Sequence, residues 1–257
     1  MQNRRKERNI ITHNLWDLYC TLGTGLNLSM LTCYGIKAIR SFPSPWPDFI
    51  YNISFQESDW KMKIDKIDEL IVKKELPPFL ITDPENSFEK CEKMLGNYGF
   101  KLIVKWPGMI MQTDSFNTEN IADCTLEKCY TDSDINNWLR TAEQNLFKGK
   151  RFSAAYRHLL KIDNINLFSL KSNGHTIGTA LVHLNNESAG IYMVSVNSDN
   201  RKKGLGTWLM KKIITEIYNL KVQFVVLQAN EMSTQMYQKI GFHSVGDFEI
   251  YWKIGLI

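Results

Sequence analysis

The spacing of apolar residues along the chain predicts alternating helices and strands. In residues 60–74 and 85–97, apolar side chains recur every three or four positions, which is typical of an amphipathic helix. Residues 10–40 are expected to be mostly helical, with Asn14 as a candidate N-cap. Residues 49–55 alternate apolar and polar positions, the pattern of a half-buried strand. The first part of the chain is therefore expected to mix both kinds of element.

The second half of the chain shows the same mixture with clearer boundaries. Asn173-Gly174 is a strong two-residue turn signal and predicts a hairpin. The short apolar run 191–196 is rich in β-branched and aromatic residues and predicts a buried strand. From Leu205 onward, apolar residues at four-residue steps predict a helix. The other expected elements are a strand at 122–129, a helix from residue 132 or 133, hairpin strands at 167–170 and 176–184, and strands at 223–227 and 249–254.

A weak internal repeat links the two halves. Residues 95–100 and 237–242 both end a predicted helix with glycine and phenylalanine and then lead into a strand. Their separation is about half the chain, which indicates two copies of one unit, divided here as domains 1–118 and 119–257. The alternative is that the similarity is general, because glycine commonly follows the last turn of a helix.

The composition is that of an ordinary soluble globular protein. Of 257 residues, 44% are hydrophobic and 23% are charged, and a net charge of +4 does not by itself indicate nucleic acid. No stretch approaches the roughly 18 consecutive apolar residues of a membrane helix. The five cysteines are irregularly spaced and include no Cys-x-x-Cys pair, which disfavours a disulfide framework and a zinc site. We therefore expect a cytoplasmic protein with no metal, no nucleic-acid partner and no membrane partner.

A basic loop that contains glycine follows the predicted buried strand and is the strongest candidate site. Arg201, Lys202 and Lys203 supply positive charge. The first turn of the helix that follows has unpaired N–H groups and a partial positive charge. Gly204 and Gly206 have no Cβ, so an anion can approach the backbone closely. The loop is predicted to bind an anion; the alternative is a tight turn with solvated charges.

The spacing Arg201-x-x-Gly204-x-Gly206 resembles the acetyl-CoA pyrophosphate motif of the GNAT superfamily of N-acetyltransferases. The order of strand, loop, amphipathic helix and second buried strand is similar to that family. Residues 237–242 look like the family's closing helix, which typically ends in a tyrosine and then Gly-Phe. The resemblance covers roughly the second half of the chain.

Two other phosphate-binding folds fit the loop less well. A dinucleotide-binding loop needs a third glycine, and Leu209 stands at that position. A P-loop ends in Gly-Lys-Ser or Gly-Lys-Thr, whereas Gly206 is followed by Thr207-Trp208. The acyl-CoA interpretation is therefore preferred.

The resemblance implies an α+β fold, with a mixed, mostly antiparallel sheet flanked by helices. It implies two tandem modules, the first of them degenerate because it lacks an Arg-x-x-Gly-x-Gly loop. It also implies acetyl-CoA as a cosubstrate, held without a metal. The residues that match the family's cofactor-binding positions are Val194, Ser195, Val196, Arg201, Lys202, Lys203, Gly204, Leu205, Gly206, Thr207 and Asn230.

Three positions that match the family carry specific expectations. Tyr237 matches the family's usual general acid, placed to protonate the CoA sulfur; the alternative is a tyrosine that packs the helix on the sheet. Asn230 matches a position that often contacts the cofactor, and it also suits a helix N-cap. The backbone N–H near Val194 is a candidate donor to the developing oxyanion.

The general base and the acceptor are not identified by the sequence. Glu187, His183 and Tyr192 lie on or near the central strands, and none of them is singled out. The acceptor cleft is expected to involve residues 138–156, and the first half of the chain is expected to shape that cleft or an interface. A homodimer is compatible with the sequence.

The leading hypothesis is an N-acetyltransferase that moves an acetyl group from acetyl-CoA to an amine by direct attack. The amine acceptor belongs to a small molecule, a peptide or a protein. The alternative from another class is a CoA-binding or interaction protein without catalysis. A third hypothesis is aminoacyl-tRNA-dependent transfer, which the loop at 201–206 argues against because those transferases generally lack an intact CoA loop.

Overall fold

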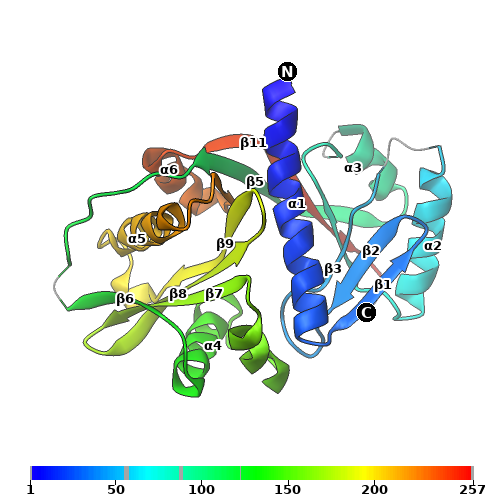
Figure 1. Cartoon of the computed structure of the whole chain (residues 1–257). Helices are drawn as coiled ribbons and strands as arrows, with labels where there is room; N and C mark the ends of the chain where they lie inside the picture. Colours follow the sequence, from blue (N-terminus) through cyan, green and yellow to red (C-terminus); the bar gives the residue numbers. More distant parts are fainter. Residues whose placement is uncertain (1, 55–57, 87–88, 122, 256–257) are drawn as a thin grey trace.

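One continuous sheet holds the chain together in the computed structural model, which describes residues 2–54, 58–86, 89–121 and 123–255 (Figure 1). The strands in these residues are β1 (Ser29–Cys33), β2 (Ile36–Arg40), β3 (Phe49–Tyr51), β4 (Phe79–Thr82), β5 (Phe100–Gln112), β6 (Cys124–Lys128), β7 (Ile165–Ser172), β8 (His175–Leu184), β9 (Ser188–Val196), β10 (Phe224–Gln228) and β11 (His243–Lys253). The α-helices are α1 (Gln2–Gly25), α2 (Trp60–Val72), α3 (Glu89–Gly96), α4 (Asp132–Leu146), α5 (Leu205–Asn219) and α6 (Glu231–Ile240). Two 3₁₀ helices are η1 (Ala154–Lys161) and η2 (Ser198–Asn200).

Apart from the edge strand β6, the strands follow the same pattern from both edges of the sheet. It runs β1-β2-β3-β4-β11-β5-β10-β9-β8-β7-β6. Each half has an antiparallel hairpin, a further strand, a helix, a parallel strand, a second helix and a long strand. The parallel pairs are β3 with β4 and β9 with β10, and the other pairs are antiparallel. The predicted α+β fold, a mixed and mostly antiparallel sheet flanked by helices, is confirmed.

The two halves exchange their long strands at the centre of the sheet. Strand β5 from the first half pairs with β10 on one side and β11 on the other. Strand β11 from the second half pairs in turn with β4 and β5. The predicted boundary after residue 118 falls between β5 and β6 and stays a prediction, because the sheet and its hydrogen bonds run through both halves. That the first half is a degenerate module also stays a prediction.

Helices cover both faces of the sheet and make three apolar cores. Helices α2 and α3 cover one face in the first half, and α5 and α6 cover the same face in the second half. Helices α1, α4 and η1 cover the opposite face. Alternation along β5 shows the two faces directly: Met109 and Met111 pack beneath α5 and α6, whereas Ile110 packs in the core of α1. Helices α5 and α6 thus share a face with α2 and α3, and α1 shares the opposite face with α4.

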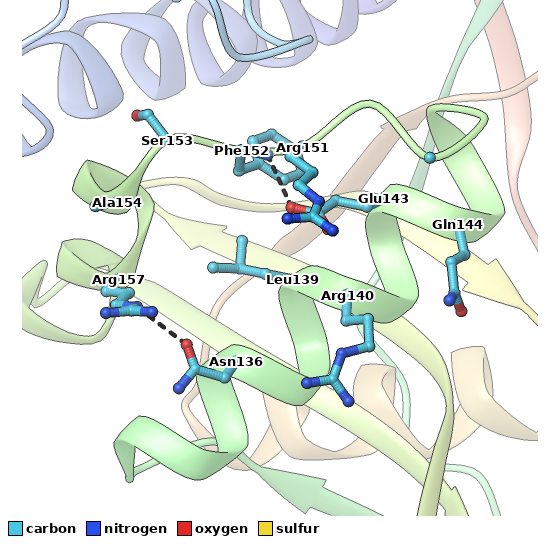
Figure 2. Close-up of a pocket in the computed structure, with 11 residues that line it drawn as sticks. Asn136, Leu139, Arg140, Glu143, Gln144, Arg151, Phe152, Ser153, Ala154 and Arg157 are labelled. Carbon is cyan, nitrogen blue, oxygen red and sulfur yellow. Dashed lines mark hydrogen bonds between the residues drawn. The ribbon is translucent and has the colours of Figure 1, made fainter.

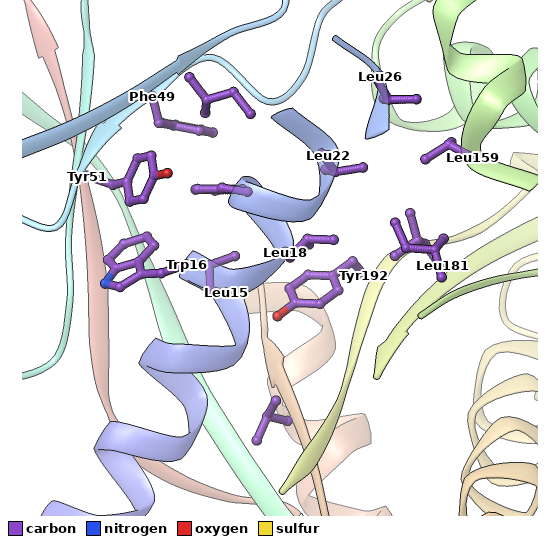
Figure 3. Close-up of a cluster of buried hydrophobic side chains, with 14 of the residues drawn as sticks. Leu15, Trp16, Leu18, Leu22, Leu26, Phe49, Tyr51, Leu159, Leu181 and Tyr192 are labelled. Atoms are coloured by element: carbon purple, nitrogen blue, oxygen red, sulfur yellow. The ribbon is translucent and has the colours of Figure 1, made fainter. Parts of the chain in front are cut away.

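Helix α1 lies along the middle of the molecule, between the two halves (Figure 1). Its side chains reach both (Figure 3): Trp16 stacks near Tyr51 of β3, with ring centroids 5.0 Å apart, and Leu22 faces Leu159 of η1. A continuous cluster of buried residues surrounds it. The first half thus supplies the helix that packs beside α4 and η1 on their face of the sheet.

Some expected elements differ from those observed. The helix predicted over 10–40 begins at Gln2 and ends at Gly25, and a hairpin follows, because Tyr34 and Gly35 adopt positive φ values of 50° and 75° in its two-residue turn. Asn14 is therefore not an N-cap. The strand predicted from 249 begins at residue 243 and is one long, bulged strand. Residues 55 and 122, included in two predicted strands, lie outside the described residues, as does residue 88 of the predicted helix 85–97.

A buried polar cluster fastens α1 to the second half. Asn14, completely buried, donates through Nδ2 to the Ser188 Oγ at 2.9 Å and accepts at Oδ1 from the Tyr192 hydroxyl at 2.7 Å. Gly190 lies directly beneath it on β9, because a Cβ there would come 2.0 Å from Asn14 Oδ1. The close approach of helix and strand thus requires glycine at this position.

Gly190→Ala is expected to lower the free energy of unfolding by about 3 kcal/mol. The added Cβ would lie 2.3 Å from Tyr192 Cε2 as well as against Asn14, so the hydrogen bond between those two side chains would break. Urea unfolding would measure the change. Gly96→Ala is the matched control, because a Cβ there meets no atom within 4 Å. Equal unfolding midpoints for the two variants would contradict this account.

No helix among the described residues combines the length and apolarity that crossing a bilayer requires.

Candidate functional site

A gap opens between the parallel strands β9 and β10. They pair only at Phe224–Ser188, Val225–Ala189 and Val226–Gly190. Beyond Gly190, β9 continues to Val196 and β10 continues to Gln228 without pairing to each other. The predicted parallel pairing, with α5 as the crossover, is confirmed. The facing backbone edges beyond that pairing are available to a ligand that lies between the strands.

A β-bulge turns the backbone of β9 at the start of this gap. The register against β8 shifts between Leu181–Tyr192 and Thr179–Ser195, so two residues of β9 face one residue of β8. Met193 adopts φ of 50°, and its carbonyl accepts from the Thr179 Oγ1 at 2.8 Å. The bulge re-aims the peptide groups around Val194 relative to the regular ladder. This is the place where the sequence predicted an oxyanion donor.

The basic loop and the start of α5 lie at the mouth of the gap. Gly204 has φ of 77° and is the N-cap of α5, and no side chain of the described residues caps this helix end. The first-turn N–H groups at residues 205–207 therefore keep their hydrogen-bonding capacity for a ligand. The Arg201 Nε donates to the Val196 carbonyl at 2.9 Å, which fixes the guanidinium beside this helix end. The local geometry is that of an anion site.

A cavity of about 720 Å³ joins the gap, the loop and helix α6. Its lining includes most of the predicted site residues: Val194, Ser195, Val196, Arg201, Lys202, Gly204, Leu205, Gly206, Thr207, Asn230 and Tyr237. The exception is Lys203, which is exposed and is not among the lining residues. The structure therefore brings together residues that stand up to 43 positions apart in the sequence. Their roles stay predictions.

The lining of the cavity combines charged and apolar side chains. Arg201 and Lys202 lie near the uncapped helix end, and Leu146, Met232 and Met236 add apolar surface. An added Cβ on Gly206 would meet Met236 Sδ at 3.4 Å. These residues fit a ligand that combines a pyrophosphate with a thin, uncharged arm, which is the chemistry of CoA.

Tyr237 is a buried residue of the cavity lining. Its side chain is 6% exposed and packs against Phe242, with ring centroids 5.7 Å apart. Burial raises the pKa of Tyr237 to about 12, although a hydrogen bond with the Ser233 side chain acts in the opposite direction. The phenol therefore keeps its proton at neutral pH and is able to donate it. It both lines the cavity and packs the helix, so the two interpretations of this tyrosine do not exclude each other.

Asn230 caps helix α6 at the rim of the cavity. Its Oδ1 accepts from the Ser233 backbone N–H at 2.9 Å, which satisfies one of the free donors of the first turn. The N-cap prediction is thereby confirmed. Because Asn230 also lines the cavity, its side-chain nitrogen is placed near any ligand bound there.

Five lining residues are not among the predicted site residues: Asn145, Leu146, Met232, Ser233 and Met236. Asn145 at the end of α4 donates from Nδ2 to the Ser195 Oγ at 3.1 Å and to the Asn197 Oδ1 at 2.8 Å. No local motif distinguishes this asparagine, because its partners lie 50 and 52 residues away. Met232 is 88% exposed, and an exposed apolar residue in the first turn after Asn230 was the available signal.

The three residues considered as a general base lie outside the cavity. His183 and Tyr192 are buried under α1, and Glu187 is exposed in the turn before β9. The His183 Nε2 accepts from the Asn164 Nδ2 at 3.0 Å and lies 3.4 Å from the Thr21 Oγ1. These contacts assign His183 to the polar cluster that fastens α1. None of the three residues lines the cavity.

The free energy of unfolding is expected to decrease as the pH is lowered, because of His183. Burial lowers the pKa of this imidazole to about 4, below its ordinary value of 6.5, even though Asp17 nearby acts in the opposite direction. Between about pH 4 and pH 6.5 the unfolded chain binds a proton at His183 that the folded protein does not bind. The contribution of His183 to the free energy of unfolding is therefore fully present above about pH 6.5 and is lost progressively as the pH falls toward about 4. The expected loss at pH 5 is about 2 kcal/mol. Urea unfolding at pH 7.5 and pH 5 would show this loss, and His183→Gln should show a smaller one; equal losses would contradict the assignment.

The expected acceptor region, residues 138–156, contacts the first half of the chain. The Ser153 backbone N–H donates to the Ser44 Oγ at 2.8 Å, and the Tyr156 hydroxyl donates to the Trp46 carbonyl. Burial raises the pKa of Tyr156 above its usual range. The loop between β2 and β3 is thus part of the surroundings of η1.

Comparison with known proteins finds one family model that matches the part of the chain around this site. Residues 133–242 match the model of the acetyltransferase (GNAT) family. No match was found among curated proteins. Within the described residues, no group of His, Cys, Asp or Glu side chains is arranged to hold a metal ion.

Solved structures share the fold of almost the whole chain. A GCN5-related N-acetyltransferase from Kribbella flavida is similar with a TM-score of 0.68 and 11% identity, over 93% of this chain and 95% of that one. A GCN5-related N-acetyltransferase from Sphaerobacter thermophilus is similar with a TM-score of 0.63 and 15% identity, over 84% and 76%. A putative acetyltransferase of the GNAT family from Novosphingobium aromaticivorans is similar with a TM-score of 0.55 and 13% identity, over 91% and 96%.

The matched residues begin in α4 and end after α6, and they contain β9, the loop, α5 and β10. The predicted resemblance of the second half to the GNAT family is therefore confirmed over residues 133–242, which match the model of that family.

Proposed function

We propose that this protein is an N-acetyltransferase that transfers an acetyl group from acetyl-CoA to the amine of an acceptor in the cytoplasm. One observation carries the proposal. The gap between β9 and β10, the uncapped start of α5 and the protonated Tyr237 all open into the same cavity. A simple anion site would need only the second of these features.

The chain's residues divide the work of binding between two kinds of contact. The N–H groups at the start of α5, with Arg201 and Lys202, hold the pyrophosphate of the cosubstrate. The free backbone edges beyond Gly190 bind the pantetheine arm between the strands. Acetyl-CoA supplies the activated thioester. These contacts orient its carbonyl carbon toward the incoming amine, which is the main benefit of a two-substrate site.

The reaction forms a C–N bond and breaks a C–S bond. A backbone N–H near Val194 stabilises the negative charge that develops on the carbonyl oxygen. Tyr237 donates its proton to the leaving sulfur. The amine loses a proton to solvent, and Tyr237 regains a proton from solvent before the next turnover. No aspartate, glutamate or histidine is among the described residues that line the cavity, so the amine reacts in its neutral form.

Release of free CoA thiol is the direct test. Purified protein would be mixed with acetyl-CoA and a panel of primary amines, and thiol release would be followed with time. The proposal expects at least one amine to raise the rate well above that of water. If acetyl-CoA stabilises the fold but no amine accelerates release, the alternative of a CoA-binding protein without catalysis is supported.

Among the residues that the structure describes, no carboxylate or imidazole lines the cavity, and this observation favours the alternative. The two functions share the cofactor site and differ only in whether Tyr237 donates a proton during a reaction. Substitution of that residue therefore separates them more clearly than further binding measurements.

A further inference from the structure

A second cavity lies between α4 and η1, on the face of the sheet opposite to α5. Its volume is about 670 Å³, which is large enough for a metabolite. Helix α4 contributes Asn136, Arg140 and Gln144, spaced four residues apart and therefore on one side of the helix. Arg151 and Arg157 come from the opposite wall (Figure 2). We call this cavity the arginine groove; it shares no lining residue with the cavity of Tyr237.

The three guanidinium groups of the arginine groove lack acidic partners. Within the described residues, no ion pair involves Arg140, Arg151 or Arg157. Arg157 Nε donates to the Asn136 Oδ1 at 3.0 Å, which leaves its terminal N–H groups unassigned (Figure 2). The groove therefore concentrates positive charge, and no ion pair among the described residues neutralises these three arginines.

The single acidic residue of the groove has a structural partner. Glu143 accepts at Oε1 from the Phe152 backbone N–H at 2.8 Å, a contact that closes the turn between α4 and η1 (Figure 2). Counting three arginines and one glutamate, the lining carries a net charge of +2. An anion with two or more negative charges would balance it.

The walls of the groove are fixed by packing. Leu139 is buried at its base, and Phe152 stacks against Tyr156 with ring centroids 4.5 Å apart. The Ser153 backbone is held by Ser44 of the first half. The arginine side chains thus extend from a rigid frame, which lowers the entropic cost of binding a ligand.

We propose that the arginine groove binds an oxyanion ligand: the phosphate or carboxylate groups of a metabolite-sized molecule. Guanidinium groups hold such oxygens with paired, charge-assisted hydrogen bonds. Arginines on both walls suit a molecule that presents oxygens in two directions. The ligand is either the anionic part of the amine acceptor or a separate anion, because the last turn of α4 places Gln144 in this groove and Asn145 in the cavity of Tyr237.

Binding of pyrophosphate and of citrate to the full chain, saturated with CoA, would test the proposal by calorimetry. CoA occupies the anion site at α5 and removes its contribution. The double variant Arg140→Gln/Arg157→Gln should weaken binding at least tenfold. The control Lys148→Gln/Lys150→Gln removes the same charge from exposed neighbours that do not line the groove, and it should change binding less than threefold.

Two results would overturn the proposal. One is that neither probe binds the wild-type protein. The other is that both double variants lose affinity equally, which would show that the probe is attracted by the overall positive charge and not by the groove. If the chain proves not to bind CoA, calorimetry with the same variants still tests the groove alone, so failure of the proposed function is recognised separately. The source of the ligand is found with ethanolamine and O-phosphoethanolamine as acceptors. A preference for the phosphorylated amine that the arginine variant loses assigns the groove to the acceptor, whereas no preference assigns it to a separate anion.

Discussion

Gly204→Glu is expected to abolish the stabilisation of this protein by acetyl-CoA. At one hundred times its dissociation constant, the cosubstrate should stabilise the wild-type fold by about 2.7 kcal/mol. This corresponds to an increase in melting temperature of roughly 5–10 °C for a chain of this size. A carboxylate at the start of α5 would repel the pyrophosphate and occupy its place, so the variant should show almost no increase. Thermal unfolding with and without acetyl-CoA would measure both proteins.

The backbone at Gly204 requires a matched control. Its φ of 77° is strained for any other residue, so the variant will lose stability for this reason alone. Gly174, in the hairpin turn between β7 and β8, has φ of 76°, and a Cβ at either glycine meets no atom within 4 Å. Gly174→Glu should therefore lose similar stability and keep the full acetyl-CoA effect. Equal responses of the two variants would show that the cosubstrate does not bind at the α5 loop.

Tyr237→Phe should reduce the rate of acetyl transfer by 10²–10⁴-fold, the usual range for loss of a general acid. The substitution removes only the hydroxyl, and the ring that packs on Phe242 remains. Because the pKa of Tyr237 is raised to about 12, the wild-type phenol is protonated throughout the neutral range, and its loss should act on kcat at every neutral pH. Acetyl-CoA binding, measured by thermal shift, should stay within threefold.

Tyr218→Phe is the appropriate comparison, because that tyrosine is exposed on α5 and does not line the cavity. Its rate and stability should match the wild type. A Tyr237→Phe enzyme with an unchanged rate but a lower melting temperature would show that Tyr237 only packs the helix. Solvent would then be the acid that protonates the leaving sulfur.

The local parts of the site were predictable from the sequence. Gly204 and Gly206, with the basic residues before them, form a pattern whose physical basis lies within six residues of backbone. The hairpin at Asn173-Gly174 has the expected positive φ values of 48° and 76° for the same reason. In such cases the information needed to specify the structure is contained in one short segment.

The parts that could not be predicted depend on distant contacts. Nothing near Asn14 indicates that α1 continues through it, because its partners, Ser188 and Tyr192, lie more than 170 residues away. The three arginines of the groove come from α4, the loop after it and η1, and only the packing of η1 on α4 brings them together. The exchange of β5 and β11 could not be predicted from the sequence either. The apolar pattern of each strand predicts a long strand but does not indicate which strands lie beside it.

That exchange has a consequence for synthesis on the ribosome. Strand β5 emerges long before β10 and β11, its two neighbours, and at typical elongation rates the delay is on the order of ten seconds. During this interval both edges of a 13-residue strand lack their final partners and could pair with another nascent chain. Lys101, Lys105 and Pro107 lie within β5, and exposed charge and proline both oppose such pairing. The strand that joins the two halves thus carries its own protection until its partners have been made.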